Sequence, residues 1–237
     1  MPPPLTSCQE MNVTYCPVWA RGPSIVLALE HAGVDYEAVF PDNWKELKPQ
    51  TPWGALPLFE APLAGKVLTL GHELAILAYI ERKCPAVGGA DEREWAVSQQ
   101  FVHQAEDVYK ALVAKQPTLY EPDKVAKEAP AERGGGDDRT LHNRKQGLQV
   151  HLGLLEAAAA ATPGKEGYLT LNGKSVGECK LWATLHMLVM IKSDVLAPFP
   201  ALTAFYERFG GEAAPKRVVD SGGRFPGALK QYFAAAA

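Results

Sequence analysis

Short apolar runs flank an amphipathic stretch near the start of the chain. Residues 12–15 alternate apolar and polar side chains, and residues 34–40 form a second such run, so both are predicted strands. Between them, residues 23–33 carry apolar side chains at helical spacing, with Pro23 suited to the first turn and Gly33 to the end. A strand, a helix and a strand this close together predict a βαβ unit with parallel strands.

The next stretch predicts two more strands and a helix. Residues 43–48 suit a short helix or a turn, while residues 55–61 and 66–70 read as strands. The four residues between these strands are short enough for a hairpin, which makes the pair antiparallel. Residues 72–84 then show helical periodicity. This order predicts a thioredoxin-like α/β domain with a mixed four-stranded sheet.

Helical spacing replaces the strand patterns in the rest of the chain. The helix around residue 182 is apolar on most sides and is therefore predicted to be buried, and Ser175 and Glu178 have the spacing of a capping box at its start. Trp95 and Trp182 lie among apolar neighbours at helical spacing, so we expect both in the core. The predicted helices span residues 91–115, 140–161, 175–192 and 199–210.

These patterns divide the chain into two domains. Residues 1–10 are predicted to be a flexible tail, and residues 11–84 the thioredoxin-like domain. The Pro/Gly-rich residues 85–91 form the predicted linker, and residues 92–237 an all-helical domain. Within that domain, the polar and Gly-rich residues 116–139 are expected to form a mobile connector.

Composition narrows the functional classes. A net charge of −3 over 237 residues gives no indication of a nucleic-acid partner or an acidic membrane. No apolar run is long enough to cross a bilayer, and the N-terminus does not resemble an export signal. The four cysteines and six histidines have no metal-ligand spacing, so we expect free thiols, no metal and a cytoplasmic location.

Four motifs in order resemble the cytosolic glutathione transferase family. They are "TYCPVWARG", "WKELKPQTPWGALP", "LTLGHELAILAYI" and "LNGKSVGECKLW". The resemblance extends over roughly residues 11–220. The combination of Tyr15, Trp44 and Lys48 is sigma-like, with some mu and pi character. The resemblance implies that glutathione is the co-substrate and that the chain is a homodimer.

The resemblance also implies where glutathione lies. Pro57 would be a cis-proline, and Leu56 would pair with the cysteinyl backbone of an extended glutathione, as in strand addition. Ala55 precedes these residues in the same motif. Trp44 and Lys48 share a helical face and would donate to the glycyl carboxylate.

His72 and Glu73 depart from the family pattern, which usually has Gln-Ser or Glu-Ser at this helix start. Backbone amides there would hold the γ-glutamyl carboxylate. Glu73 removes a hydroxyl donor and would repel that carboxylate, unless it caps the helix and points away or meets the ligand's ammonium. His72 could replace the Gln as a donor. Gln99 and Gln100 stand where Tyr-type members often lend an acidic residue across the dimer, so we expect weakened or altered glutathione binding.

Two neighbouring side chains compete for the catalytic role. Tyr15, at the end of the first strand, could donate a hydrogen bond to the glutathione sulfur and stabilise the thiolate. Cys16 is followed by proline, as in thiol transferases, but six residues with Gly22 and Pro23 among them separate it from the expected helix start. The loop is also about two residues longer than the family's usual form.

Three functions therefore remain open. The first is a glutathione transferase in which Tyr15 activates the thiol for conjugation, isomerisation or lyase chemistry on a small electrophile. The second is a glutathione-dependent thiol transferase that uses Cys16 as nucleophile. The third is a non-catalytic member of the fold that binds an apolar ligand or a protein partner.

Overall fold

The fold is built around a mixed four-stranded sheet. The computed structural model describes residues 11–114, 147–161, 168–170 and 174–220. The strands stand in the order β2-β1-β3-β4, with β1 parallel to β2 and antiparallel to β3, and β3 antiparallel to β4. They span β1 (Met11–Thr14), β2 (Tyr36–Val39), β3 (Leu58–Leu63) and β4 (Lys66–Gly71). This confirms the predicted thioredoxin-like fold.

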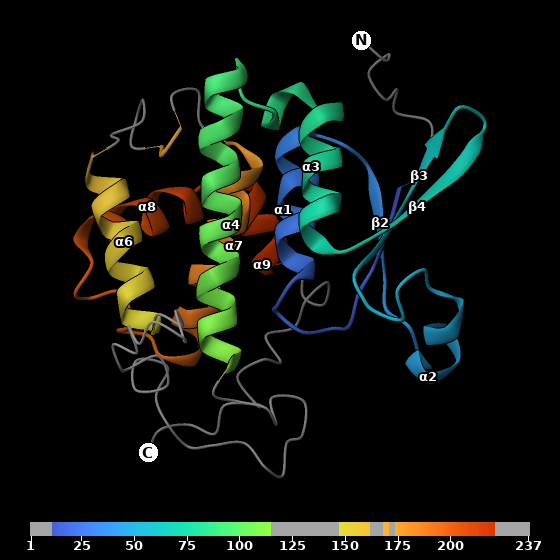
Figure 1. Ribbon diagram of the computed structural model, residues 1–237, viewed down its shortest axis with the longest axis horizontal. Coiled ribbons are helices and arrows are strands. Elements are labelled where there is room, and N and C mark those ends of the chain that lie inside the picture. The colour runs from blue at the N-terminus through green and yellow to red at the C-terminus, as the bar shows by residue number, and fades with distance from the viewer. Residues whose placement is uncertain (1–10, 115–146, 162–167, 171–173, 221–237) are drawn as a thin grey trace, which may run out of the picture.

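Two helices separate the sheet from the rest of the molecule. In Figure 1, α1 (Gly22–Ala32) and α3 (Glu73–Lys83) lie between the sheet and the long helices. Gly33 ends α1 in the left-handed conformation, with φ of 66°, as the sequence predicts. Before β3 the chain forms α2 (Trp44–Leu47) and the 3₁₀ turn η1 (Lys48–Gln50), and after α3 it forms η2 (Pro85–Val87).

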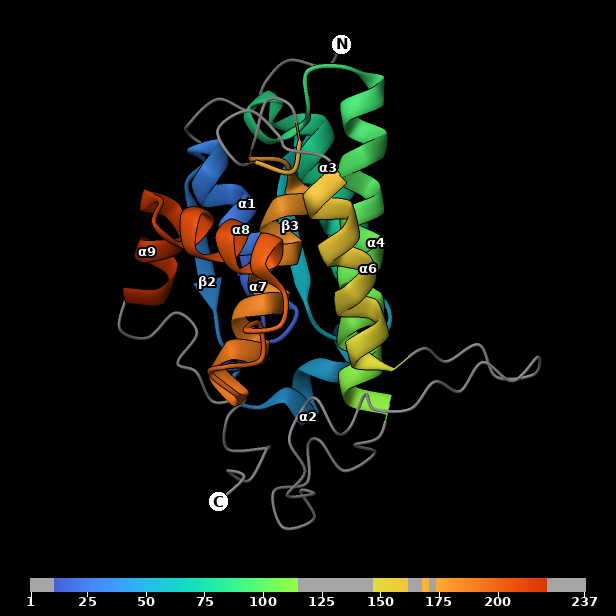
Figure 2. The same ribbon diagram turned by 90° about the vertical axis from the view of Figure 1, so that its left-hand side faces the viewer.

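The second half of the described chain is helical. Its elements are α4 (Glu92–Ala114), α6 (Leu148–Ala161), α7 (Val176–Ile191), α8 (Pro200–Gly210) and α9 (Ala213–Asp220). Helix α7 is buried on most sides and packs against both α4 and α1, while α9 lies beside α1 (Figure 2). The predicted capping box of Ser175 and Glu178 is present at the start of α7.

A glycine allows α4 and α7 to approach closely. A Cβ on Gly177 would lie 2.3 Å from the backbone oxygen of Ser98 on α4. The amide of Gly177 also donates a 3.1 Å hydrogen bond to the Ser98 hydroxyl. The contact between the two helices therefore depends on the absence of a side chain at this position.

Three sequence expectations need correction. Strand β3 begins at Leu58 rather than at residue 55, because Pro57 has no N–H for the ladder. Trp95 is 43% exposed rather than core, because the first two turns of α4 bury Glu94 and Ser98 instead. Helix α9 was not predicted, because Pro215 lies within it; this proline occupies the first turn, where the missing N–H costs little.

Several predictions concern residues outside the described ranges. These are the tail at 1–10, the connector at 116–139 and the first part of the helix expected at 140–161. The domain limits remain a prediction. Within the part of the chain that the structure describes, no helix is both long and apolar enough to cross a membrane.

Candidate functional site

The strand register brings distant segments to one end of the sheet. Leu58, the first residue of β3, pairs with Thr14 at the end of β1 and with Gly71 at the end of β4. The residues that follow these two strands and precede β3 therefore meet at the same end. This end lies opposite the tip of the β3–β4 hairpin (Figure 1) and contains Tyr15, Pro57 and His72.

Tyr15 stands directly after β1 and is 6% exposed. Its backbone N–H donates to the carbonyl of Val39 at 3.0 Å, which fixes the end of the strand. Its phenol oxygen accepts a 3.1 Å hydrogen bond from the backbone N–H of Arg21. A donor at the phenol oxygen polarises the O–H bond and makes the phenol a better hydrogen-bond donor in turn.

Cys16 is half-buried in the loop between β1 and α1. Burial raises the pKa of its thiol, which lowers the thiolate fraction at neutral pH. Helix α1 begins at Gly22, so its N-terminal dipole is six residues further along the chain. Neither feature favours Cys16 as a nucleophile.

The motif before β3 contributes the other predicted residues. The peptide bond between Leu56 and Pro57 is cis, as predicted. Ala55 is exposed and Leu56 half-buried. Trp44 is half-buried on α2, and Lys48 is exposed, with its aliphatic stem beside Gly54, where a Cβ would lie 3.6 Å from the Lys48 Cε.

His72 is exposed at the start of α3, and an exposed tryptophan lies beside it. The ring centroids of Trp53 and His72 are 5.6 Å apart, and Trp53 is 66% exposed. The tryptophan also covers Gly71, because a Cβ there would lie 2.7 Å from Trp53 Cδ1. The sequence reasoning did not single out Trp53, although it stands within the quoted motif.

Glu73 turns inward, away from this end of the sheet. Its side chain is 2% exposed, and its carboxylate lies 2.7 Å from the ammonium nitrogen of Lys180 on α7. The Ser24 hydroxyl donates a second hydrogen bond to it. Of the alternatives weighed from the sequence, the structure favours a carboxylate that points away from the expected ligand. Burial raises the pKa of Glu73, and Lys180 and Ser24 oppose that rise.

A set of four charged side chains, three of them buried and Arg21 half-buried, joins the two halves of the molecule. We call Arg21, Glu73, Glu106 and Lys180 the ion cluster. Glu106 on α4 accepts from the Arg21 guanidinium at 2.7 Å and from Lys180 at 3.3 Å. The sequence reasoning missed Lys180, but a single lysine within the apolar run of α7 is a signal that could have identified it.

Gln99 and Gln100 have different surroundings. The Gln99 amide donates to the carboxylate of Glu81 on α3, which also accepts from Ser98. Gln100 is exposed on α4. Gln99 therefore serves the contact between α3 and α4 in this chain.

The longer loop places a tryptophan inside the helical domain. Trp19 is 1% exposed, and its indole nitrogen donates a 2.9 Å hydrogen bond to the carbonyl of Ala183 on α7. Its ring lies 4.6 Å from that of His186 between centroids. The extra residues of this loop therefore connect the Tyr15 end of the sheet to α7.

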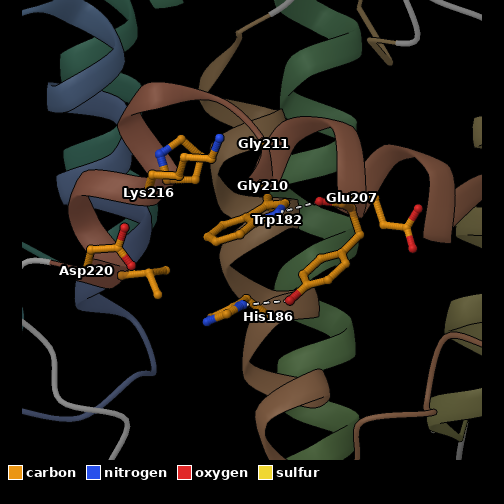
Figure 3. Close-up of a pocket in the computed structure, with 10 residues that line it drawn as sticks. Trp182, His186, Glu207, Gly210, Gly211, Lys216 and Asp220 are labelled. Atoms are coloured by element: carbon orange, nitrogen blue, oxygen red, sulfur yellow. Dashed lines mark hydrogen bonds between the residues drawn. The ribbon is translucent and has the colours of Figure 1, made fainter.

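A cavity of about 410 Å³ opens on the far side of these rings, between α7, α8 and α9 (Figure 3). Trp182 stacks on His186 at 4.7 Å and 12°, and His186 Nδ1 lies 2.7 Å from the Tyr206 hydroxyl. Burial lowers the pKa of His186 to about 4. Lys216 and Asp220 stand at the rim. None of the sequence-predicted site residues lines this cavity.

Among the described residues, no group of three or more His, Cys, Asp or Glu side chains could hold a metal ion.

Comparisons with known proteins bear on this arrangement. The chain is 33% identical, over 127 residues, to the glutathione S-transferase class-mu 28 kDa isozyme of Schistosoma mansoni, covering 51% of this chain and 58% of that protein. It is 38% identical over 74 residues to probable glutathione S-transferase 7 of Caenorhabditis elegans, covering 30% and 34%. The match thus spans little more than half the length of the Schistosoma relatives and about a third of the Caenorhabditis elegans one, and no protein-family model matches the chain.

A comparison of the fold with solved structures gives the same result. The glutathione S-transferase of Ascaris lumbricoides superposes with a TM-score of 0.72 over 93% of this chain and 99% of that one, at 22% identity. In the matched part of its sequence and in its fold, the chain is similar to cytosolic glutathione S-transferases. Its departures from the family pattern at Glu73 and in the Tyr15 loop are therefore variations within the glutathione S-transferase fold. The sigma-like subclass stays a prediction.

Proposed function

We propose that this chain is a glutathione transferase that activates the glutathione thiol with Tyr15. The observation that carries the proposal is the convergence of Tyr15, the Leu56–Pro57 segment and the start of α3 at one end of the sheet. An extended tripeptide can span these three segments. Leu56 would pair with the cysteinyl backbone through its N–H and C=O.

The two ends of glutathione meet different groups in this proposal. Trp44 and Lys48 would donate to the glycyl carboxylate, with Ala55 beside them. The first amides of α3, from Glu73 onward, would hold the γ-glutamyl carboxylate together with the helix dipole. His72 would act as a side-chain donor at the same place. The Glu73 side chain takes no part in ligand contact, because it is bound to Lys180.

Tyr15 would then set the protonation of the sulfur. Free glutathione has a thiol pKa of about 8.5, so the thiol form predominates at neutral pH. A phenol that donates to the sulfur stabilises the thiolate, and the thiol proton passes to solvent. The thiolate attacks an electrophilic carbon, a C–S bond forms, and a leaving group such as halide departs with its electron pair. The small electrophile would bind between the two domains.

The assembly and location are further parts of the proposal. We propose a homodimer, since this is usual for the family that the sequence resembles, and a cytoplasmic location. We also propose that the first domain ends at residue 84 and that the second begins at residue 92. Light scattering of the purified chain tests the dimer.

The cavity at Trp182 and His186 supports a second candidate, which is binding of an apolar ligand without turnover. Its aromatic wall suits a flat small molecule, and Tyr15 is not among its lining residues. The thiol transferase alternative has weaker support, because burial raises the pKa of Cys16.

Calorimetric titration with glutathione, followed by turnover of a chromogenic aryl halide, tests the proposal. Saturable binding and glutathione-dependent turnover are expected. Absence of both would overturn the transferase proposal and favour the ligand-binding candidate.

A further inference from the structure

The ion cluster draws its four side chains from four different segments. Arg21 stands just before α1, Glu73 is the first residue of α3, Glu106 lies on α4, and Lys180 on α7. Lys180 is central, since its ammonium lies 2.7 Å from Glu73 and 3.3 Å from Glu106. One residue of the helical domain thus holds carboxylates on both sides of the domain contact.

Burial makes the pairing obligatory. The side chains of Lys180, Glu73 and Glu106 are 1%, 2% and 8% exposed. Two positive and two negative charges make the cluster neutral as a whole. Removing one partner leaves a charge that must take up a proton, lose one or move to solvent. Although burial favours the neutral acid, Lys180 and Arg21 lower the pKa of Glu106 overall.

At one end the cluster fixes the start of α3. The residue before this helix, His72, has φ of 65° and ψ of 117° and makes no side-chain cap. The first turn is instead held through Glu73, which is bound to Lys180 and to Ser24 on α1. The first amides of a helix have no acceptor within it, so with the Glu73 side chain turned inward those of α3 can donate to a ligand at this end of the sheet.

At its other end the cluster fixes the donor to Tyr15. The Arg21 guanidinium is bound by Glu106 at 2.7 Å and lies 4.3 Å above the centroid of the Tyr109 ring. The backbone N–H of the same arginine donates to the Tyr15 hydroxyl. Tyr15 and the start of α3 are thus connected to α4 and α7 through one set of charges.

We propose that Lys180 is a positioning residue for the glutathione site, because it retains the Glu73 carboxylate in the interior and so keeps the first turn of α3 open to the γ-glutamyl carboxylate. This inference rests on the proposed function. It also explains how the chain carries Glu where the family has a small hydroxyl residue. Without Lys180, Glu73 would move toward solvent and its charge would stand beside the ligand's carboxylate.

The test compares Lys180→Met with the charge-free pair Glu73→Gln/Lys180→Met. Lys180→Met is expected to raise the glutathione Kd about tenfold, because two like charges then lie close together. In the double variant the glutathione Kd is expected to lie within about threefold of the wild-type value, since Glu73 and Lys180 have both lost their charge. Lys110→Met, the same change at an exposed position of α4, should leave Kd unchanged.

A pH series separates positioning from simple support of the fold. The charged groups facing Glu73 are Lys180, Arg21 and Glu106, with the Ser24 hydroxyl. In Lys180→Met the Kd should fall as pH is lowered from 7 toward 5, because Glu73 beside the ligand's carboxylate has a pKa above its ordinary value of about 4.3, and its protonation ends the repulsion. In wild type this change should be absent. An equal Kd in Lys180→Met and wild type, or a pair variant no better than Lys180→Met, would overturn the proposal.

Hydrogen exchange makes the result independent of the transferase proposal. In Lys180→Met the amides of residues 76–78, whose acceptors lie at His72 and in the first turn of α3, should exchange at least about tenfold faster, while those of α9 keep their wild-type rates. If wild type binds no glutathione, the proposed function fails, and the exchange data alone decide whether Lys180 fixes α3. Should Lys180→Met not fold, Glu73→Gln is expected to show the same faster exchange. Wild-type exchange in that variant would refute the role.

Discussion

The backbone N–H of Arg21 donates a 3.1 Å hydrogen bond to the phenol oxygen of Tyr15. This contact spans the whole loop between β1 and α1, which is longer than the family's usual form. It holds the hydroxyl of the residue that follows β1, at the end of the sheet where β3 begins. The proposed catalytic group is thus placed by the backbone and not only by packing of its ring.

Substitution of Tyr15 by Phe should lower kcat/KM for an aryl halide about ten- to a hundredfold, because one hydrogen bond to a charged sulfur is lost. Glutathione binding should persist, since Leu56 and the start of α3 are unchanged. Steady-state kinetics and calorimetry measure the two effects. Tyr79→Phe is the matched control, because the Tyr79 hydroxyl is buried without a hydrogen-bond partner among the described residues. Equal activity of Tyr15→Phe and wild type would remove Tyr15 from the mechanism.

Cys16→Ser should leave aryl halide turnover within about twofold of wild type. The thiol has a raised pKa from burial and no helix N-terminus beside it, so it contributes little thiolate. Reduction of a mixed disulfide by glutathione should be equally slow in both proteins. A selective loss of that activity in the variant would instead support the thiol transferase alternative.

The free energy of unfolding should decrease as pH falls from about 6.5 to about 4. The pKa of His31 and that of His186 are each lowered to about 4, in both cases first of all by burial. Both are neutral in the folded chain, so their contribution is present above the unfolded pKa of about 6.5 and is lost as protons bind the unfolded state. Each accounts for up to about 3 kcal/mol.

Chemical denaturation of wild type and His186→Gln at pH 7 and pH 4.5 measures this decrease. Glutamine is polar but does not titrate in this range, so the variant should lose less stability than wild type between the two pH values. Parallel curves for the two proteins would show that His186 is not the titrating group.

Gly177→Ala should destabilise the chain by about 1–3 kcal/mol, because the new methyl group meets the backbone of Ser98 and α4 must move. Gly153→Ala provides the control, since a Cβ there has no neighbour within 4 Å and lies in α6. It should be neutral or stabilising by up to about 1 kcal/mol. Urea unfolding compares the two, and equal midpoints would contradict the close contact between α4 and α7.

Local patterns predict local structure well in this chain. Pro23 and Gly33 bracket α1, and Ser175 and Glu178 mark the start of α7, because caps and breakers act within a few residues. The cis peptide before Pro57 is also confirmed, although it was implied by the family resemblance and not by a local pattern. The position of Trp95 was not predicted correctly, because the polar residues Glu94 and Ser98 occupy the buried face at the start of α4.

The direction of Glu73 illustrates what the sequence could not provide. The residue was expected beside the ligand, and repulsion was one of several alternatives. Its actual partner, Lys180, is 107 positions away in the sequence, and no local spacing connects them. The same holds for Trp19 and Ala183, which meet only because the longer loop reaches α7. Long-range pairs of this kind decide the electrostatics of the site.

The central claim is that the glutathione sulfur lies beside the phenol of Tyr15. Ultraviolet absorption of the thiolate, followed against pH with glutathione bound, tests this most directly. The account predicts an apparent thiol pKa below the free value of about 8.5 in wild type and a return toward that value in Tyr15→Phe. The same pKa in both proteins, or no thiolate signal from bound glutathione, would contradict it.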